Sequence, residues 1–151
     1  MEKEKLISLI CEKDQRLNVL TGRRNNYIFG FDENSVGKML NILSSTKEEL
    51  HPTDLCKILG VTTPRITIIL NSMEEKGLIE RKMASEDRRK ITVVLTAKGK
   101  RAIKARNQKN YEFFEKVYEK LGPEDAEALY RSMQAYEEVY LEMKPDSDTE
   151  E

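Results

Sequence analysis

The clearest pattern along this chain is a set of apolar residues at i, i+3, i+4 and i+7, the spacing that lines one face of a helix. The set comprises Ile66, Ile69, Leu70 and Met73. Ahead of it, Gly60 can adopt the left-handed conformation that ends a helix, and Pro64 suits the first position of the next one. Because the residue before a proline avoids the α region, we expect Thr63 to stand outside the second helix and to cap it. The pattern predicts a helix-turn-helix whose first helix starts at Pro52.

Two runs of β-forming residues follow, at 78–83 and 90–95, on either side of the mostly polar segment 84–89. They predict a β-hairpin. Its tip is basic, because Arg88 and Arg89 lie in the connecting segment.

Further helical patterns precede this module. One long helix is predicted over residues 2–20, and a second helix, capped by Asp32, is predicted to end near residues 44–46. The segment 22–31 between them is too short and mixed to assign. Leu50-His51 is expected to form a short strand before the helix-turn-helix.

Two helices are predicted after the hairpin. Thr96 is expected to cap a helix over 97–121, and Gly122 with Pro123 would end that helix and start the last one. The last helix carries apolar residues at heptad-like spacing, a stripe too large for a lone helix to expose to water. They are Leu129, Tyr130, Met133, Tyr136, Val139, Tyr140 and Met143. The acidic residues 145–151 are expected to form a disordered tail.

Length and composition set the class of protein. A chain of 151 residues with 35% charged and 38% hydrophobic residues fits one soluble, helix-rich domain. No apolar run approaches the roughly twenty residues that cross a bilayer, and the charged start lacks a signal peptide's apolar core. We therefore expect a cytoplasmic protein.

The charge is unevenly distributed. The net charge of −1 alone argues against nucleic-acid binding. Residues 50–106, however, hold 13 basic and 6 acidic residues, whereas residues 107–151 hold 5 basic and 13 acidic ones. A basic centre beside an acidic region can approach phosphates without binding every polyanion through the whole surface.

Three motifs then point to a family. They are Glu75-Lys76-Gly77-Leu78-Ile79-Glu80-Arg81, Asp87-Arg88-Arg89, and Leu95-Thr96-Ala97-Lys98-Gly99. In this order and spacing they resemble the MarR family of bacterial transcriptional regulators. The resemblance implies a mainly α fold with a small β-hairpin, in which a winged helix-turn-helix DNA-binding module is flanked by long dimerisation helices. The expected division is a helical dimerisation region at 1–31 and 107–144 and a winged-helix DNA-binding region at 32–106.

The resemblance also implies a function, a sequence-specific regulator that binds an inverted repeat in double-stranded DNA as a homodimer. We expect a repressor that a small aromatic or phenolic effector can release. The alternative is a winged-helix adaptor that binds protein through the same surface, and the basic centre with its arginine-tipped wing favours DNA.

The candidate DNA contacts fall into three groups. Base edges would be read from the exposed face of the second helix, by Arg65, Thr67, Ile68 and Asn71. Phosphates would meet the N-terminus of that helix, at Thr62 and Thr63. The wing would supply Arg81, Lys82 and Lys90 to the sugar-phosphate backbone and Asp87, Arg88 and Arg89 at the minor groove. In the family the aspartate of the Asp-x-Arg motif orients the arginine, and Asp87 and Arg89 occupy these positions. Family members often carry a polar or basic residue where this chain has Ile68, which leaves the preferred sequence open.

Other chemistries have little support. A single histidine, His51, and two cysteines supply neither a catalytic pair nor a zinc cluster, so we expect no enzyme activity, no cofactor and no metal. Cys56 is expected to be a structural thiol. Cys11 is a candidate oxidant sensor, with a buried inert thiol as the commoner alternative. Six aromatic residues are candidates either for a ligand pocket or for the core: Tyr27, Phe29, Phe31, Tyr111, Phe113 and Phe114.

Overall fold

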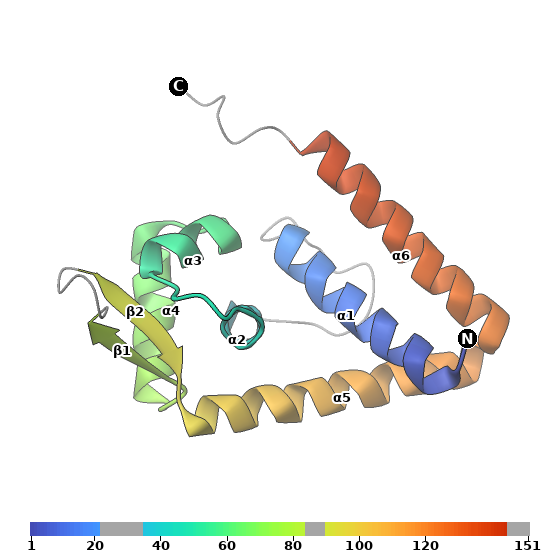
Figure 1. The fold of residues 1–151 in the computed structure, drawn as a ribbon, viewed down its shortest axis with the longest axis horizontal. Helices are drawn as coiled ribbons and strands as arrows, with labels where there is room; N and C mark the ends of the chain where they lie inside the picture. The colour runs from blue at the N-terminus through green and yellow to red at the C-terminus, as the bar shows by residue number, and fades with distance from the viewer. Residues whose placement is uncertain (22–34, 84–89, 145–151) are drawn as a thin grey trace.

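The computed structural model describes residues 1–21, 35–83 and 90–144 (Figure 1). The elements are α1 (Lys3–Thr21), α2 (Ser35–Ser45), α3 (Pro52–Leu59), α4 (Thr63–Glu75), β1 (Ile79–Met83), β2 (Ile91–Leu95), α5 (Ala97–Leu121) and α6 (Pro123–Met143). The predicted cap at Asp32, the unassigned segment 22–31 and the predicted tail 145–151 lie outside the described residues. Among the helices that are described, none is long and apolar enough to cross a membrane.

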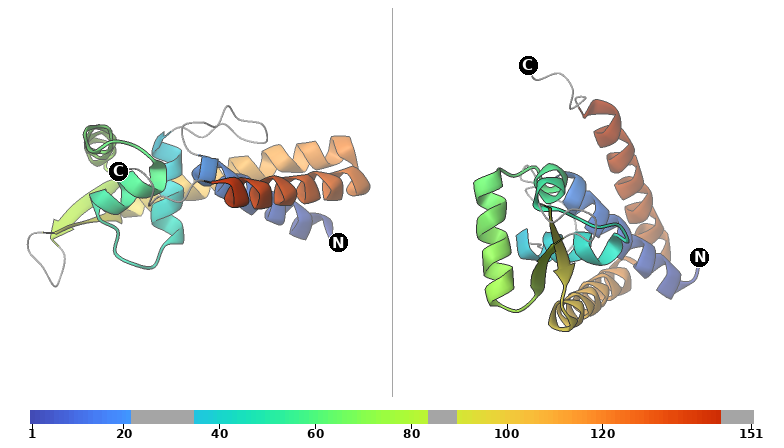
Figure 2. Two further views of the ribbon diagram at one scale, coloured as in Figure 1. Left: turned by 90° about the horizontal axis from the view of Figure 1, so that it is seen from above. Right: turned by 60° about the vertical axis from the view of Figure 1, so that its left-hand side comes forward.

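The molecule has two ends joined by one helix. Figure 2 shows α3, α4 and the hairpin at one end, and α1, α6 and the distal half of α5 at the other. The 25 residues of α5 span the two, a length of about 37 Å. As predicted, Thr96 caps this helix, since its hydroxyl accepts a hydrogen bond from the Gly99 amide at 3.0 Å.

One hydrophobic cluster holds the helix-turn-helix against the hairpin. The four predicted residues of the α4 stripe are all buried in it, together with Met39 and Leu40 of α2, Leu55 of α3 and Ile79 of β1. The two strands pair antiparallel, with Ile79 opposite Leu95 and Met83 opposite Ile91. This arrangement confirms a mainly α fold with a small β-hairpin.

The strand predicted at Leu50-His51 does not form. Only the Leu50 carbonyl joins the hairpin, by accepting a hydrogen bond from the Val93 amide at 2.9 Å. The ladder stops there because His51 is the N-cap of α3 and donates its amide to the Asp54 carboxylate at 2.9 Å. A residue that closes a capping box has no amide left for a strand.

A second hydrophobic cluster joins α1, α5 and α6. It contains Leu6, Ile7, Ile10, Cys11 and Leu17 of α1, Phe114 of α5, and Ala126 and Met133 of α6. Beside it, the buried Glu137 of α6 forms ion pairs with Lys13 and Arg16 of α1. Because a buried carboxylate is costly without such partners, this cluster fixes how α6 lies on α1.

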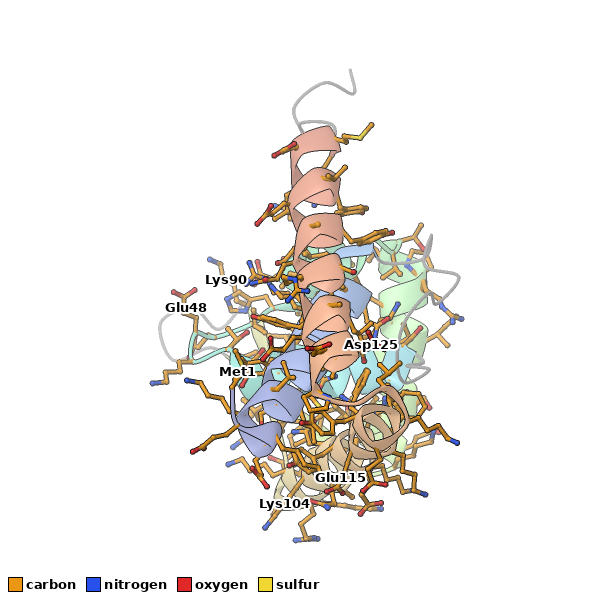
Figure 3. All side chains as sticks on the ribbon, turned by 90° about the vertical axis from the view of Figure 1, so that its right-hand side faces the viewer. Met1, Glu48, Lys90, Lys104, Glu115 and Asp125 are labelled. Carbon is orange, nitrogen blue, oxygen red and sulfur yellow. The ribbon has the colours of Figure 1, made fainter. Side chains whose placement is uncertain are left out.

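The predicted apolar stripe of α6 is divided between two environments. Met133 is fully buried, and Leu129 and Tyr130 pack against the second cluster. Further along, Val139 is 52% exposed and Met143 is 77% exposed. Figure 3 shows this C-terminal half of α6 projecting past the rest of the molecule. Within the described part of the chain, this end of the helix is left exposed.

Candidate nucleic-acid interface

The turn before α4 has the predicted conformation, but the residue that caps α4 is one position earlier than predicted. Gly60 has φ 64° and ends α3 in the left-handed region. The N-cap of α4 is Thr62, whose hydroxyl accepts a hydrogen bond from the Arg65 amide at 3.3 Å. The prediction that Thr63 caps the helix is therefore wrong. Pro64 occupies the second helical position, where its missing N–H costs nothing because the first four amides of a helix have no intrahelical acceptor.

One face of α4 is left open to solvent. The predicted base-reading residues lie on it, and each of them is exposed: Arg65, Thr67, Ile68 and Asn71. Ile68 is 61% exposed and takes no part in the core. Thr62 and Thr63 are exposed at the N-terminus of the helix, where backbone amides point outward. The helix thus offers donors at its start and a mixed apolar and amide surface along its length.

The wing strands carry two exposed lysines beside this face. Lys82 near the end of β1 and Lys90 just before β2 are both exposed. Lys82 lies 3.7 Å from Glu80, an exposed ion pair on the same face of the strand that contributes little to stability. The predicted minor-groove residues Asp87, Arg88 and Arg89 lie outside the described residues.

Arg81 differs from these lysines. Strand alternation places it on the same face as the buried Ile79, so its side chain lies over α4 rather than toward solvent. Its Nη2 donates to Asn71 Oδ1 at 2.6 Å, and its Nε lies 3.2 Å from Glu74 Oε2. Arg81 is predicted to reach the sugar-phosphate backbone, as Lys82 is; in this structure its guanidinium contacts α4, and its contact with DNA stays a prediction. Sequence patterns gave no signal for this contact, because the residues belong to two elements of different periodicity.

The first half of α5 carries further exposed basic residues. They are Lys100, Arg101 and Lys104. Lys98 has a structural contact as well, since its Nζ donates to the Lys76 carbonyl at 2.7 Å. That bond ties the start of α5 to the C-terminus of α4, where a cation also suits the helix dipole.

The remaining candidate residues have structural surroundings. His51 Nδ1 lies 2.8 Å from the Ile91 carbonyl, and Cys56 is half-buried in α3. Burial, together with the nearby carboxylates of Asp14 and Glu12, raises the pKa of the Cys11 thiol to about 12. An oxidant sensor needs the opposite, a thiolate at neutral pH, so the environment of Cys11 disfavours that role.

The aromatic residues of α5 contribute to the core rather than to a pocket. Phe114 is buried in the second cluster, Tyr111 packs against it, and the ring of Phe113 meets that of Phe114 edge to face at 5.1 Å. Tyr27, Phe29 and Phe31 lie outside the described residues.

Comparison with known proteins bears directly on this surface. The sequence profile of the MarR family matches residues 38–90. Two curated proteins of Bacillus subtilis (strain 168) match parts of the chain. The HTH-type transcriptional repressor YetL is 39% identical over 64 residues, which cover 42% of this chain and 38% of YetL. The uncharacterized HTH-type transcriptional regulator YfiV is 27% identical over 84 residues, 56% of this chain and 52% of YfiV. The chain thus spans about half or less of each relative's length.

The fold is shared over a longer stretch. The crystal structure of Streptococcus pneumoniae FabT in complex with DNA is similar to this chain with a TM-score of 0.64 and 21% identity. The similarity covers 91% of this chain and 90% of FabT, so it includes the flanking helices as well as the winged helix. The matched residues contain the helix-turn-helix and β1 but end before β2, so they include two of the three motifs that predicted the family, those at 75–81 and 87–89. Residues 38–90 thus match the MarR family, and the chain shares its overall fold with FabT.

Proposed function

We propose that this protein is a transcriptional repressor that binds an inverted repeat in double-stranded DNA as a homodimer. The observation that carries the proposal is the open face of α4, which is exposed although the opposite face is packed into the core. A helix held in this way can enter a major groove, with the wing beside it against the flanking backbone. The names of the relatives agree, since YetL is a transcriptional repressor and FabT is seen in complex with DNA.

The dimeric state rests on α6. The exposed apolar residues of its C-terminal half that share one face are Tyr136, Val139 and Met143. Contiguous apolar surface of this kind marks an interaction site, and a second copy of the same helix is its natural partner in a two-fold dimer. On this proposal residues 1–31 and 107–144 form the dimerisation region and residues 32–106 form the DNA-binding region.

Selection of sites from random duplex DNA by the purified protein tests this function. We expect an inverted repeat whose half-sites are about 10 bp apart, because two α4 helices related by a two-fold axis would enter successive major grooves. Flanks rich in A·T pairs are expected as well, since a narrow minor groove attracts the arginines of a wing. Enrichment of a single half-site, or of no duplex at low salt, would contradict the proposal and favour the protein-binding adaptor.

Release by a small effector is a separate part of the proposal. A cavity of about 430 Å³ opens between α1, α2, α3 and α5. Its lining combines apolar residues, among them Val19, Ile42 and Ile58, with Gln15 and Asn107, which are hydrogen-bonded to each other at 3.0 Å. Arg16 also lines the cavity, and its Nε is 2.6 Å from the Glu137 carboxylate of α6. An anionic ligand at Arg16 would compete with Glu137 and alter the packing of α6 on α1.

We expect small aromatic acids to bind in this cavity. A panel of them should include members that raise the melting temperature and lower the affinity for the selected duplex by at least about tenfold, a usual coupling between two sites. Ile58→Asp places a charge in the cavity and should abolish both effects, whereas Lys57→Asp, on the neighbouring exposed position, should retain them. If no acid shifts the melting temperature or releases DNA, the effector proposal fails and the DNA-binding proposal remains.

A further inference from the structure

Arg81 connects the wing to the helix that would enter the major groove. Figure 1 shows β1 lying beside α4, and Arg81 of β1 contacts two residues of α4. Its guanidinium makes two contacts, with Asn71 Oδ1 at 2.6 Å and with Glu74 Oε2 at 3.2 Å. Asn71 and Glu74 are three residues apart on α4 and therefore share the side of the helix that faces the wing.

The contact determines which way the Asn71 amide points. A guanidinium carries only N–H donors, so the amide must present its oxygen to Arg81. Its NH2 group is then the part directed away from Arg81. The reversed amide would set donor against donor.

The two purines differ in what they require from an amide. Adenine offers an acceptor at N7 and a donor at N6, so asparagine pairs with it by using both its NH2 group and its oxygen. Guanine offers two acceptors, N7 and O6. Arg81 occupies only one of the two lone pairs of the Asn71 amide oxygen, but it turns that oxygen toward the wing, so that the NH2 group is the part left to meet a base, and its two donors fit guanine.

We propose that Arg81 is a positioning residue that sets the base preference of the regulator, by holding Asn71 as a hydrogen-bond donor for guanine instead of the bidentate partner of adenine. The inference rests on the proposed function, and it specifies which base Asn71 on the open face of α4 would contact. The contact is suited to persist on DNA, because the Arg81 side chain is only 27% exposed and is paired with the Glu74 carboxylate. The same ion pair neutralises Glu74, an acid that would otherwise face the phosphates.

The test compares three variants on duplexes that differ at single base pairs of the selected half-site. Asn71→Ala identifies the base pair that Asn71 reads, because discrimination disappears there. At that base pair the wild type is expected to prefer guanine to adenine. Arg81→Met keeps the length of the side chain but frees the amide oxygen, and should shift the preference toward adenine by roughly tenfold, within the range for one bidentate pair. Arg81→Lys retains a donor for the oxygen and should preserve the guanine preference.

Lys82→Met is the matched control, since Lys82 is the next residue of β1 and lies on its opposite face. It should weaken binding to all duplexes by the same factor, as the loss of a phosphate contact does. If Arg81→Met behaves in the same way, or if the wild type prefers adenine at the base pair read by Asn71, the inference is overturned while the regulator remains. If the wild type binds no duplex, the proposed function fails and this inference with it. Circular dichroism and thermal unfolding confirm that each variant is folded.

Discussion

Replacing Gly99 with alanine is expected to lower the free energy of unfolding by about 3 kcal/mol, the upper end of the usual cost of overpacking. A β-carbon at this position would lie 2.1 Å from the Leu78 carbonyl oxygen and 3.0 Å from Leu95 Cδ2. The carbonyl cannot move aside easily, because it accepts a hydrogen bond from the Thr96 amide at 3.1 Å. The first turn of α5 would have to separate from the corner between α4 and β1.

Urea unfolding followed by circular dichroism measures this effect as a shift of the midpoint at unchanged slope. Lys100→Ala is the control, because Lys100 is exposed in the same turn of α5 and its replacement should stay within about 0.5 kcal/mol of the wild type. The loss in Gly99→Ala occurs despite the higher helix propensity of alanine, which by itself would stabilise the helix. A variant as stable as the wild type would mean that α5 does not approach Leu78 so closely.

Introducing a charge on the exposed apolar face of α6, by Val139→Glu, is expected to convert the proposed dimer into a monomer. Val139 is 52% exposed and lies near Tyr136 and Met143 on that face. An unpaired carboxylate buried at the centre of a dimer contact costs far more than the contact of one valine contributes. Light scattering should then give about 17.5 kDa, the mass of one chain, in place of twice that value.

The same variant should lose at least about 100-fold in affinity for the inverted repeat, because two linked half-sites no longer bind together. Its affinity for an isolated half-site should be unchanged, which separates loss of dimerisation from damage to the DNA-binding surface. Arg131→Glu, on the polar side of α6, introduces the same side chain and should leave both mass and affinity as they are. A Val139→Glu protein that remains dimeric would show that another surface joins the protomers.

The open face of α4 illustrates how much a local pattern can predict. Four apolar residues at helical spacing were enough to identify the buried side, and the opposite side follows from 100° per residue. The family motifs then predicted that a wing follows this helix. The contact of Arg81 with Asn71 was missed because it depends on how the hairpin folds back onto α4, and no periodicity relates the two side chains.

The sequence by itself determined the features that depend on neighbours within about four residues. These include the left-handed ending of α3 at Gly60, the cap of α5 at Thr96 and the break between α5 and α6 at Gly122. Each follows from backbone dihedral preferences or from a hydrogen bond to a residue close in the chain. Only the tertiary structure decided that Leu50 and His51 form no strand. It also decided that Glu137 of α6 forms ion pairs with Lys13 and Arg16 of α1. It also decided the surroundings of the Cys11 thiol and which atom of Asn71 faces outward, because packing between distant segments sets burial, charge partners and the direction of a side chain.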